Sequence, residues 1–313
     1  MSILHSKIII LGSGPSGLTA GIYAARANLN PTLITGSEVG GQIILTNKID
    51  NYPGFPDGVN GFELANLMKQ QAESFNVNFV SASAKEVTQI NDNGKISFLI
   101  TTTTNTQYSC DALIIACGCS KRLSNIKGEN ELFGYGVSTC ATCDGMFYKN
   151  KVVAVIGGGN TACKDALYLA DIATKVLLIN SSSELSSFPN LLKQTISKQN
   201  IEIYNDSSLN EIVGSKELGV KEIVITKNKS TTSLVCDGVF ISTGFKPNSE
   251  IFSSLIELDS RGYIKTEPDS TRTSLDGVFA CGDIRSGNIH QITTAVGTAC
   301  LAVSEAEKYL KSI

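Results

Sequence analysis

The chain has 313 residues, 42% hydrophobic and 18% charged, and its 26 basic and 29 acidic residues give a formal net charge of -3. This length is enough for about two domains of ordinary size, and the composition is typical of a globular protein and excludes a disordered one. The charge balance leaves no excess of cations for a phosphate backbone, so we expect no nucleic-acid partner, and no apolar run reaches the about 18 residues of a membrane-spanning helix.

Two features bear on the compartment. Residues 1–7 lead directly into an apolar strand, without the basic region and cleavage site of a secretory signal. The 9 cysteines of such a chain are expected to be buried thiols with one reactive pair, rather than a disulfide framework. We therefore expect a cytoplasmic protein.

The first part of the chain predicts a strand, a glycine-rich turn and a helix in succession. The unbroken apolar run at residues 7–11 is typical of a buried strand, residues 12–17 are rich in glycine, and residues 18–28 have helical character. A second apolar strand at residues 32–34 completes a βαβ unit.

The same succession recurs in the second half of the chain. Its members are a strand at 152–156, a glycine-rich turn at 157–162, a helix to about 171 and a strand at 175–179. Each half also has a hairpin-like alternating stretch and closes on a similar phrase, at 96–100 and 110–118 and again at 223–225 and 236–244. Two duplicated dinucleotide-binding domains are the simplest explanation.

The chain after residue 244 is too short for a third domain, so we expect it to rejoin the first. The second domain is then an insertion between two crossing strands, near residues 117–120 and 244–247. The sequence predicts an α/β protein with two Rossmann-like dinucleotide-binding domains, each with a small antiparallel β element. Their expected bounds are 1–118 with 246–313 for the first domain and 119–245 for the second.

The two glycine turns point to two nucleotides. In such a turn, glycines permit the tight bend, the approach of a pyrophosphate and close helix–strand packing, while the helix N-terminus presents free N–H groups to the anion. Two in-frame copies suggest two cofactors, with a flavin beside a nicotinamide as the expected pair. The acid that usually follows the second strand fits imperfectly, because Glu38 and Glu184 both come late.

Cys140 and Cys143 form the only Cys-x-x-Cys in the chain. Two thiols at this spacing can open and close a small disulfide ring, and the adjacent Asp144 can deliver protons. The alternatives are two buried thiols or half of a zinc site. Structural zinc needs four ligands, and only Cys117 and Cys119 could complete the set, so we expect no metal.

The chain resembles the bacterial-type, low-molecular-weight thioredoxin reductases over its whole length. The phrase Cys-Ala-Thr-Cys-Asp between two nucleotide motifs is the most specific match. The matching phrases are residues 12–17, 23–29, 40–42, 51–54, 140–145, 157–162, 243–244 with 247–248, and 282–283.

This resemblance implies a homodimeric FAD enzyme. Electrons pass from a reduced nicotinamide to FAD, then to the disulfide, and then to thioredoxin or a similar small protein. It assigns FAD to the first domain and the nicotinamide, with the redox-active disulfide, to the second. It also implies that Cys143 lies against the flavin, that Cys140 exchanges with the substrate disulfide, and that Asp144 manages protons.

The resemblance also implies the binding residues. Those for FAD are Gly12, Ser13, Gly14, Pro15, Ser16, Gly17, Thr35, Gly36, Gly41, Gln42, Asn51, Asp283, His290, Gln291 and Ile292. Those for the nicotinamide nucleotide are Gly157, Gly159, Asn160, Thr161 and Ala162. Apolar residues spaced by three and four from Ala295 onward predict a helix whose N-terminus favours an anionic flavin.

Two positions depart from the family pattern. His290 stands where an arginine usually precedes Gln291, and it can still donate a hydrogen bond to the flavin. Residues 180–187 lack the arginines that hold the 2′-phosphate of NADPH in the family. We therefore expect poor discrimination in favour of NADPH, with NADPH or NADH as donor. A ferredoxin-like donor and a non-enzymatic flavin redox sensor are the remaining alternatives.

Overall fold

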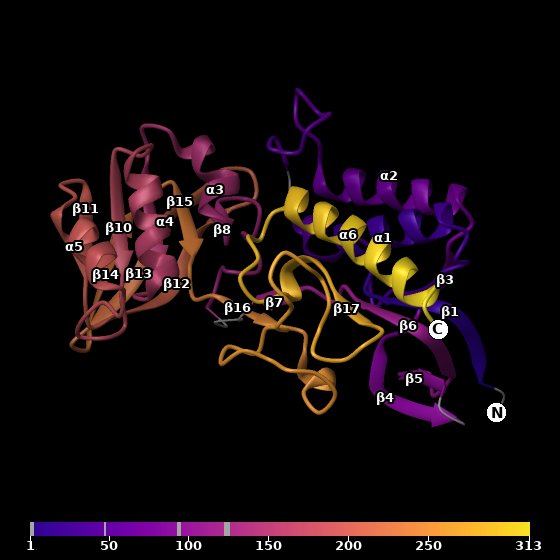
Figure 1. Ribbon diagram of the computed structural model, residues 1–313. Coiled ribbons are helices and arrows are strands. Elements are labelled where there is room, and N and C mark those ends of the chain that lie inside the picture. The colour runs from indigo at the N-terminus through magenta and orange to yellow at the C-terminus, as the bar shows by residue number, and fades with distance from the viewer. Residues whose placement is uncertain (1–2, 47, 93–94, 122–125) are drawn as a thin grey trace. The chain divides into compact units, whose positions relative to one another are not determined.

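The computed structural model describes residues 3–46, 48–92, 95–121 and 126–313 (Figure 1). The chain divides into two compact units. Unit 1 is Met1–Ser120 with Lys246–Ile313, and unit 2 is Lys121–Phe245. Within the described part of the chain, no helix combines the length and apolar character needed to cross a membrane.

Unit 1 is built on a seven-stranded sheet in the order β3-β2-β1-β6-β5-β4, with β17 beside β6. Its core strands are parallel, whereas β4, β5 and β6 pair antiparallel. The strands are β1 (Leu4–Leu11), β2 (Thr32–Ile34), β3 (Asn78–Val80), β4 (Ala84–Asp92), β5 (Lys95–Thr102), β6 (Gln107–Ile115) and β17 (Val278–Ala280). The helices are α1 (Pro15–Arg26), α2 (Gly61–Ser74) and α6 (Ile292–Leu310), with short 3₁₀ turns η1 (Gly41–Leu45), η3 (Glu250–Phe252) and η4 (Gly282–Ile284).

The unbroken apolar run of β1 reflects burial on both faces of this sheet. Ile8 and Ile10 pack into one core with α1, α2 and α6, and Ile9 and Leu11 pack into a second core on the other face. Figure 1 shows these three helices as one layer over the sheet. This packing on both faces holds the carboxyl ends of the parallel strands next to the glycine turn that follows β1.

Unit 2 repeats this plan with a five-stranded, all-parallel sheet in the order β11-β10-β9-β15-β8. Its strands are β8 (Val137–Ser138), β9 (Val152–Ile156), β10 (Lys175–Ile179), β11 (Ile201–Tyr204) and β15 (Gly238–Ile241). The helices are α3 (Ala141–Asp144), α4 (Asn160–Ala170) and α5 (Pro189–Ser197), with η2 (Gly145–Tyr148). A separate antiparallel sheet holds β12 (Ser207–Ser215), β13 (Gly219–Lys227) and β14 (Ser230–Val235).

The two segments that join the units are short strands. β7 (Cys119–Lys121) and β16 (Phe245–Pro247) pair in a two-stranded sheet. The predicted fold class, two Rossmann-like units that each carry an antiparallel element, is confirmed by this topology and by its likeness to solved relatives reported below. Helices α1 and α6 each begin three residues before their predicted starts at Leu18 and Ala295.

Candidate functional site

The first glycine turn joins β1 to α1 in unit 1. The Gly12 N–H bonds the carbonyl of Ile34 at 2.8 Å, and its φ of 103° is open to glycine but strained for other residues. A Cβ on Gly17 would lie 1.8 Å from the Gly12 carbonyl oxygen. Helix α1 begins at Pro15 behind Gly14, which has no side chain to cap it. Its first N–H groups are thus available to an anion.

The segment after β2 folds against this turn. Ser13 Oγ donates to the Thr35 carbonyl at 2.7 Å, and the Gly40 N–H donates to the Ser13 carbonyl at 2.9 Å. A Cβ on Gly41 would stand 3.1 Å from the Gly14 Cα. The structure therefore places the predicted residues of the turn and of the 35–42 segment side by side.

Two amides connect more distant predicted residues within unit 1. Asn51 Nδ2 donates to Gln291 Oε1 at 3.2 Å, and Gln291 is the residue before α6. Gln42 Nε2 donates to the Cys119 carbonyl. The first of these bonds brings Asn51 to the N-terminus of α6, whose Gln291 N-cap makes no side-chain cap bond.

A buried polar loop follows β17. A Cβ on Gly282 would lie 2.6 Å from Ser16 Oγ, so this loop lies against the first turn of α1. Asp283 Oδ1 and Asn288 Nδ2 are buried, and neither has a hydrogen-bond partner among the described residues. Burial raises the pKa of Asp283, whereas nearby His290 and Asn288 lower it. An acceptor and a donor left unpaired beside a glycine turn fit a hydroxyl-rich dinucleotide such as FAD.

The second glycine turn joins β9 to α4 in unit 2. The Gly157 N–H bonds the Ile179 carbonyl at 2.9 Å, and a Cβ on Gly157 would meet the Ser242 carbonyl oxygen at 2.8 Å. Gly159 precedes α4 without a capping side chain, and a Cβ there would meet nothing closer than 3.9 Å. This open turn can admit a pyrophosphate.

The first turn of α4 holds the other predicted residues of this site. Asn160 Oδ1 accepts hydrogen bonds from Ser187 Oγ and from the Phe188 N–H, both at 2.9 Å. Thr161 is exposed, and Ala162 is buried against the turn. Asn160 therefore anchors the end of the loop that follows β10, and its side chain is committed to this contact.

Cys140 and Cys143 form a disulfide with their Cα atoms 5.2 Å apart. The short helix α3 creates this approach, because the N–H groups of Cys143 and Asp144 bond the Cys140 carbonyl at 3.2 and 3.1 Å. Ser138 Oγ accepts a hydrogen bond from the Cys140 N–H at 3.0 Å. Both sulfur-bearing residues are half-exposed, so the bond can exchange with a partner.

The other seven cysteines are free thiols. Burial raises the pKa of Cys117, Cys119, Cys236 and Cys281 to about 12, which keeps these thiols protonated and unreactive. Their side chains fill space between strands and helices. The disulfide pair is therefore the centre of thiol chemistry in the described part of the chain.

Three polar residues near the glycine turns were not predicted from the sequence. Asn288 lies in the loop of Asp283, Asp165 bonds Ser242 beneath the second turn, and the Asp206 N–H bonds the Ser182 carbonyl. Asp165, four residues after Thr161 on α4, is the one that helical spacing could have revealed. Asp206 could not be found this way, because its position depends on the order of strands in the sheet.

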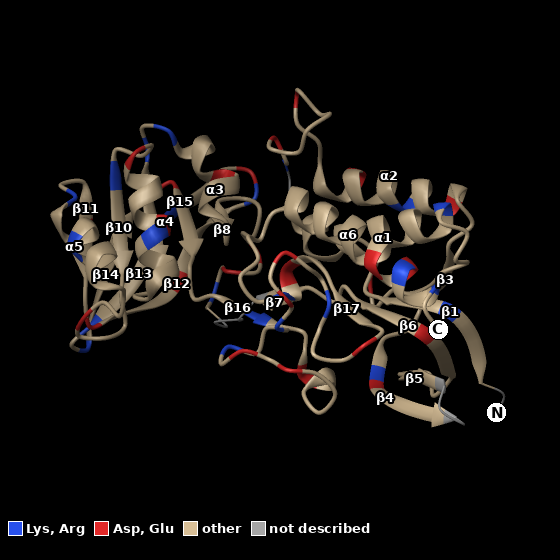
Figure 2. Cartoon of the chain, in the orientation of Figure 1, with Lys and Arg blue, Asp and Glu red and all other residues tan. Residues whose placement is uncertain are grey.

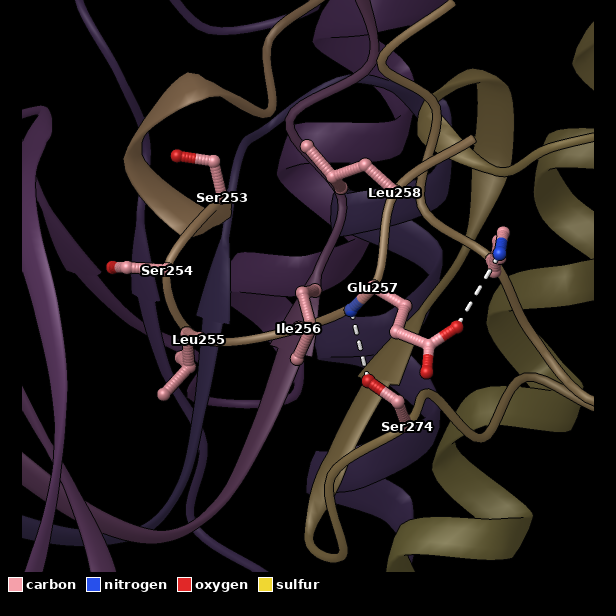
Figure 3. A pocket seen from close by; sticks show the side chains of 8 residues that line it. Ser253, Ser254, Leu255, Ile256, Glu257, Leu258 and Ser274 are labelled. Atoms are coloured by element: carbon pink, nitrogen blue, oxygen red, sulfur yellow. Dashed lines mark hydrogen bonds and ion pairs between the residues drawn. The ribbon is translucent and has the colours of Figure 1, made fainter. Parts of the chain in front are cut away.

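A groove elsewhere in unit 1 holds none of the predicted residues (Figure 3). Its lining is mainly serine and aliphatic, from residues 253–258, Lys265 and Ser274. The Glu257 N–H bonds Ser274 Oγ at 2.9 Å, and Lys265 Nζ lies 3.3 Å from Glu257 Oε2. Its charged groups, Glu257 and Lys265, are paired with each other, so we assign the groove no chemistry.

Comparison with known proteins identifies the family. The model of the pyridine nucleotide-disulphide oxidoreductases matches residues 6–299. The chain belongs to this family. A thioredoxin reductase of Vibrio cholerae serotype O1 is 42% identical over 320 residues, which cover 99% of this chain and 98% of the relative.

Two further relatives, one of known structure and one with a different name, were compared with the oxidoreductase chain. The solved thioredoxin reductase of Streptococcus pyogenes MGAS5005 superposes with a TM-score of 0.93 at 34% identity, covering 100% of both chains. A glucosaminate ammonia-lyase of Pseudomonas fluorescens is 39% identical over 100% of this chain and 98% of that relative. The expected resemblance to thioredoxin reductases is thus confirmed over the whole chain, while the reaction itself must be argued from the site.

Proposed function

We propose that this oxidoreductase passes electrons from a reduced nicotinamide dinucleotide through FAD and the Cys140–Cys143 disulfide to thioredoxin or a similar small protein. The observation that carries the proposal is that disulfide, half-exposed at α3 in a unit that also holds a dinucleotide turn. The other seven cysteines are free thiols, so the Cys140–Cys143 disulfide is the bond that can exchange with a disulfide of another protein.

We assign FAD to unit 1. The N-terminus of α1, from Gly14 to Gly17, would hold the pyrophosphate, and Asp283 and Asn288 would satisfy hydroxyl groups with their unpaired atoms. The α6 N-terminus, with Gln291, would lie at the flavin and favour its reduced, anionic form. Bound there, FAD supplies a two-electron acceptor between the nicotinamide and the disulfide.

We assign the nicotinamide nucleotide to the second glycine turn, on Gly157, Gly159, Asn160, Thr161 and Ala162. The free N–H groups at the start of α4 support this assignment, because they offer a pyrophosphate the same contacts as the turn in unit 1. Asn160 contributes by holding the loop at residues 187–188.

The thiol steps use the roles that the resemblance implies for the two cysteines. The hydride lost by the donor, with one proton from solution, reduces the internal disulfide to a dithiol. The Cys140 thiolate then attacks the acceptor disulfide and forms a mixed disulfide. Cys143 attacks the Cys140 sulfur, which restores the internal bond and releases the acceptor as a dithiol. We assign Asp144 the transfer of a proton to the departing thiolate.

The resemblance also supports a homodimer acting in the cytoplasm. A compartment that keeps thiols reduced is consistent with seven free cysteines and one disulfide in the protein. The oligomeric state is measured by sedimentation equilibrium on the flavoprotein.

A turnover assay tests the proposal. The purified protein should be yellow, release FAD on denaturation, and reduce a supplied thioredoxin with NADH or NADPH as donor. Thioredoxin with both active-site cysteines replaced by serine is the control and should give no turnover. A colourless protein that FAD cannot reconstitute, or a flavoprotein that reduces no protein disulfide with either donor, would refute the proposed function.

A further inference from the structure

We propose that the donor site of unit 2 selects NADH, the dinucleotide with a free 2′-hydroxyl, over NADPH. This inference rests on the proposed function, because it concerns the same donor site. In Rossmann units the end of the second strand reads this position: a carboxylate accepts from the hydroxyl, whereas an arginine is needed to accommodate a phosphate. In unit 2, the residues that follow β10, from Asn180 onward, occupy this position.

The end of β10 lies directly beside the glycine turn. Ile179 pairs in parallel register with Ile156, the last residue before the turn, so Asn180 follows at the level of the turn itself. A Cβ on Gly158 would stand 2.1 Å from Asn180 Oδ1. The segment after Asn180 is therefore the segment that meets the ribose of a bound adenosine.

This segment is fixed at its start by Asn180. Asn180 Nδ2 donates to the Ser182 carbonyl and to Asn205 Oδ1, both at 2.9 Å, and its Oδ1 accepts from the Ser182 N–H at 3.2 Å. These bonds use both amide hydrogens of the buried Asn180 side chain and tie it to both backbone polar groups of Ser182. The start of this segment is thus held by the protein's own contacts.

The end of the segment is tied to the turn in the same way. The Ser186 N–H bonds the Gly158 carbonyl at 2.7 Å, and Ser187 and Phe188 bond Asn160. Between the two anchors, residues 181–184 are exposed and carry three hydroxyls and one carboxylate. The loop therefore offers three neutral hydroxyl groups and one acidic acceptor between two fixed ends.

The fixed charge at this position is negative. Glu184 lies within the loop, and Asp206 lies against it, because the Asp206 N–H bonds the Ser182 carbonyl at 3.0 Å. Both carboxylates are exposed. A 2′-phosphate with about -1.5 to -2 charges would be repelled by them, whereas a hydroxyl could donate to either.

The loop that follows β10 has no basic residue of its own. Residues 176–192 include neither lysine nor arginine. Lys175 is at the opposite end of β10, where it forms an ion pair with Glu202. Lys164, exposed on α4, is the remaining lysine close to the turn on that helix, and it is close enough to lower the pKa of Asp165. Figure 2 shows the basic and acidic residues of this unit interspersed along its elements.

Calorimetric titration of the oxidised flavoenzyme tests this selectivity without turnover. The probes are NAD⁺ and NADP⁺, with 5′-ADP and 2′,5′-ADP as fragments that isolate the 2′ position. We expect NAD⁺ to bind more tightly than NADP⁺, and 5′-ADP to bind more tightly than 2′,5′-ADP. Raising the ionic strength should reduce the difference in affinity within each pair of probes, because salt screens the repulsion between the 2′-phosphate and the two carboxylates.

Three variants identify the residues responsible. The double variant Ser181→Arg, Ser182→Arg should tighten NADP⁺ binding by about tenfold or more and leave NAD⁺ binding nearly unchanged. The double variant Glu184→Gln, Asp206→Asn should also raise the ratio of NADP⁺ to NAD⁺ affinity, by a smaller factor. The control Ser233→Arg adds one positive charge on the edge strand β14 and should leave the ratio of NADP⁺ to NAD⁺ affinity unchanged.

The outcomes separate this inference from the proposed function. Wild-type protein that binds NADP⁺ as tightly as NAD⁺, or more tightly, would overturn the inference, and loss of an NADP⁺ preference in Lys164→Ala would identify the cation responsible. Binding of neither dinucleotide would also overturn it. Absence of thioredoxin reduction with NAD⁺-selective binding intact would refute the proposed function alone.

Discussion

Ser242 donates a hydrogen bond from its Oγ to Asp165 Oδ2 at 2.6 Å. This bond joins the residue after β15 to helix α4, directly beneath the second glycine turn, where a Cβ on Gly157 would strike the Ser242 carbonyl. Burial raises the pKa of Asp165 to about 6, although the bond from Ser242 and the charge of Lys164 lower it. The carboxyl group therefore changes charge close to neutral pH, next to the candidate donor site.

The first prediction concerns the pH dependence of stability. The folded protein holds the Asp165 proton more tightly than the unfolded chain, whose pKa is near 3.8. The stabilisation is fully present below that value and is lost as the pH rises through about 6. Asp165→Asn cannot ionise, so its stability relative to wild type should rise by about 1–3 kcal/mol between about pH 4 and pH 7.

Thermal unfolding followed by circular dichroism, at a series of pH values, measures this difference. Ser242→Ala serves as the companion variant, because loss of its hydrogen bond to the carboxylate should move the transition to higher pH. A difference in midpoint temperature between Asp165→Asn and wild type that stays constant across this range would contradict the assignment.

The second prediction concerns the unpaired groups in the loop after β17. Asp283→Ala and Asn288→Ala should each weaken FAD binding, because Asp283 Oδ1 and Asn288 Nδ2 lack partners within the described protein. Hydrogen bonds to charged groups contribute about 1.5–3 kcal/mol, so we expect about a 10- to 100-fold loss for Asp283 and a smaller loss for Asn288. Fluorescence titration of the apoprotein with FAD measures both.

Ser254→Ala, exposed in the groove of Figure 3, is the control for that titration. It should bind FAD as tightly as wild type. If both loop variants also bind like wild type, the two buried groups have another role and the placement of FAD in unit 1 needs revision.

The repeated βαβ units could be predicted from the sequence because parallel strands buried on both faces give unbroken apolar runs. Residues 7–11 and 152–156 have this property, and both lie in strands that end at a glycine turn. The predicted start of α1 at Leu18 is wrong by three residues. Pro15 was attributed to the turn, whereas a proline is favoured at the first position of a helix, where its missing N–H costs nothing.

Polar contacts of the sites were less predictable, because they depend on which strands become neighbours. Asp206 meets Ser182 only because β11 pairs with β10. Asp283 Oδ1 and Asn288 Nδ2 are unpaired within the described part of the chain because the folded loop buries them. Neither the composition nor the spacing of residues in the sequence predicts that burial. The glycines were predictable, since their role follows from the local geometry of one turn.

The third prediction compares two helical glycines. Gly17→Ala should abolish or severely weaken FAD binding and lower stability by several kcal/mol, because its Cβ would lie 1.8 Å from the Gly12 carbonyl oxygen. Gly297→Ala on α6 meets nothing within 4 Å and should be neutral or stabilise by about 0.5–1 kcal/mol. Bound flavin absorbance and chemical unfolding measure the two effects. Equal behaviour of the two variants would show that the close packing of the first turn is not required.

The last prediction separates the roles of the two cysteines in the disulfide. Cys140→Ser should leave Cys143 as a free thiol, and, if Cys143 lies against the flavin, its thiolate should produce a long-wavelength charge-transfer band. Cys143→Ser should leave Cys140, to which we assign the exchange with the acceptor, without such a band. Both variants should lose thioredoxin reduction, because exchange needs an attacking thiol and a resolving thiol. Cys163→Ser, at a buried packing position, is the control and should retain activity. Thioredoxin reduction at the wild-type rate by Cys143→Ser would refute the two-thiol exchange, and a charge-transfer band in Cys143→Ser rather than Cys140→Ser would reverse the assignment of the two sulfurs.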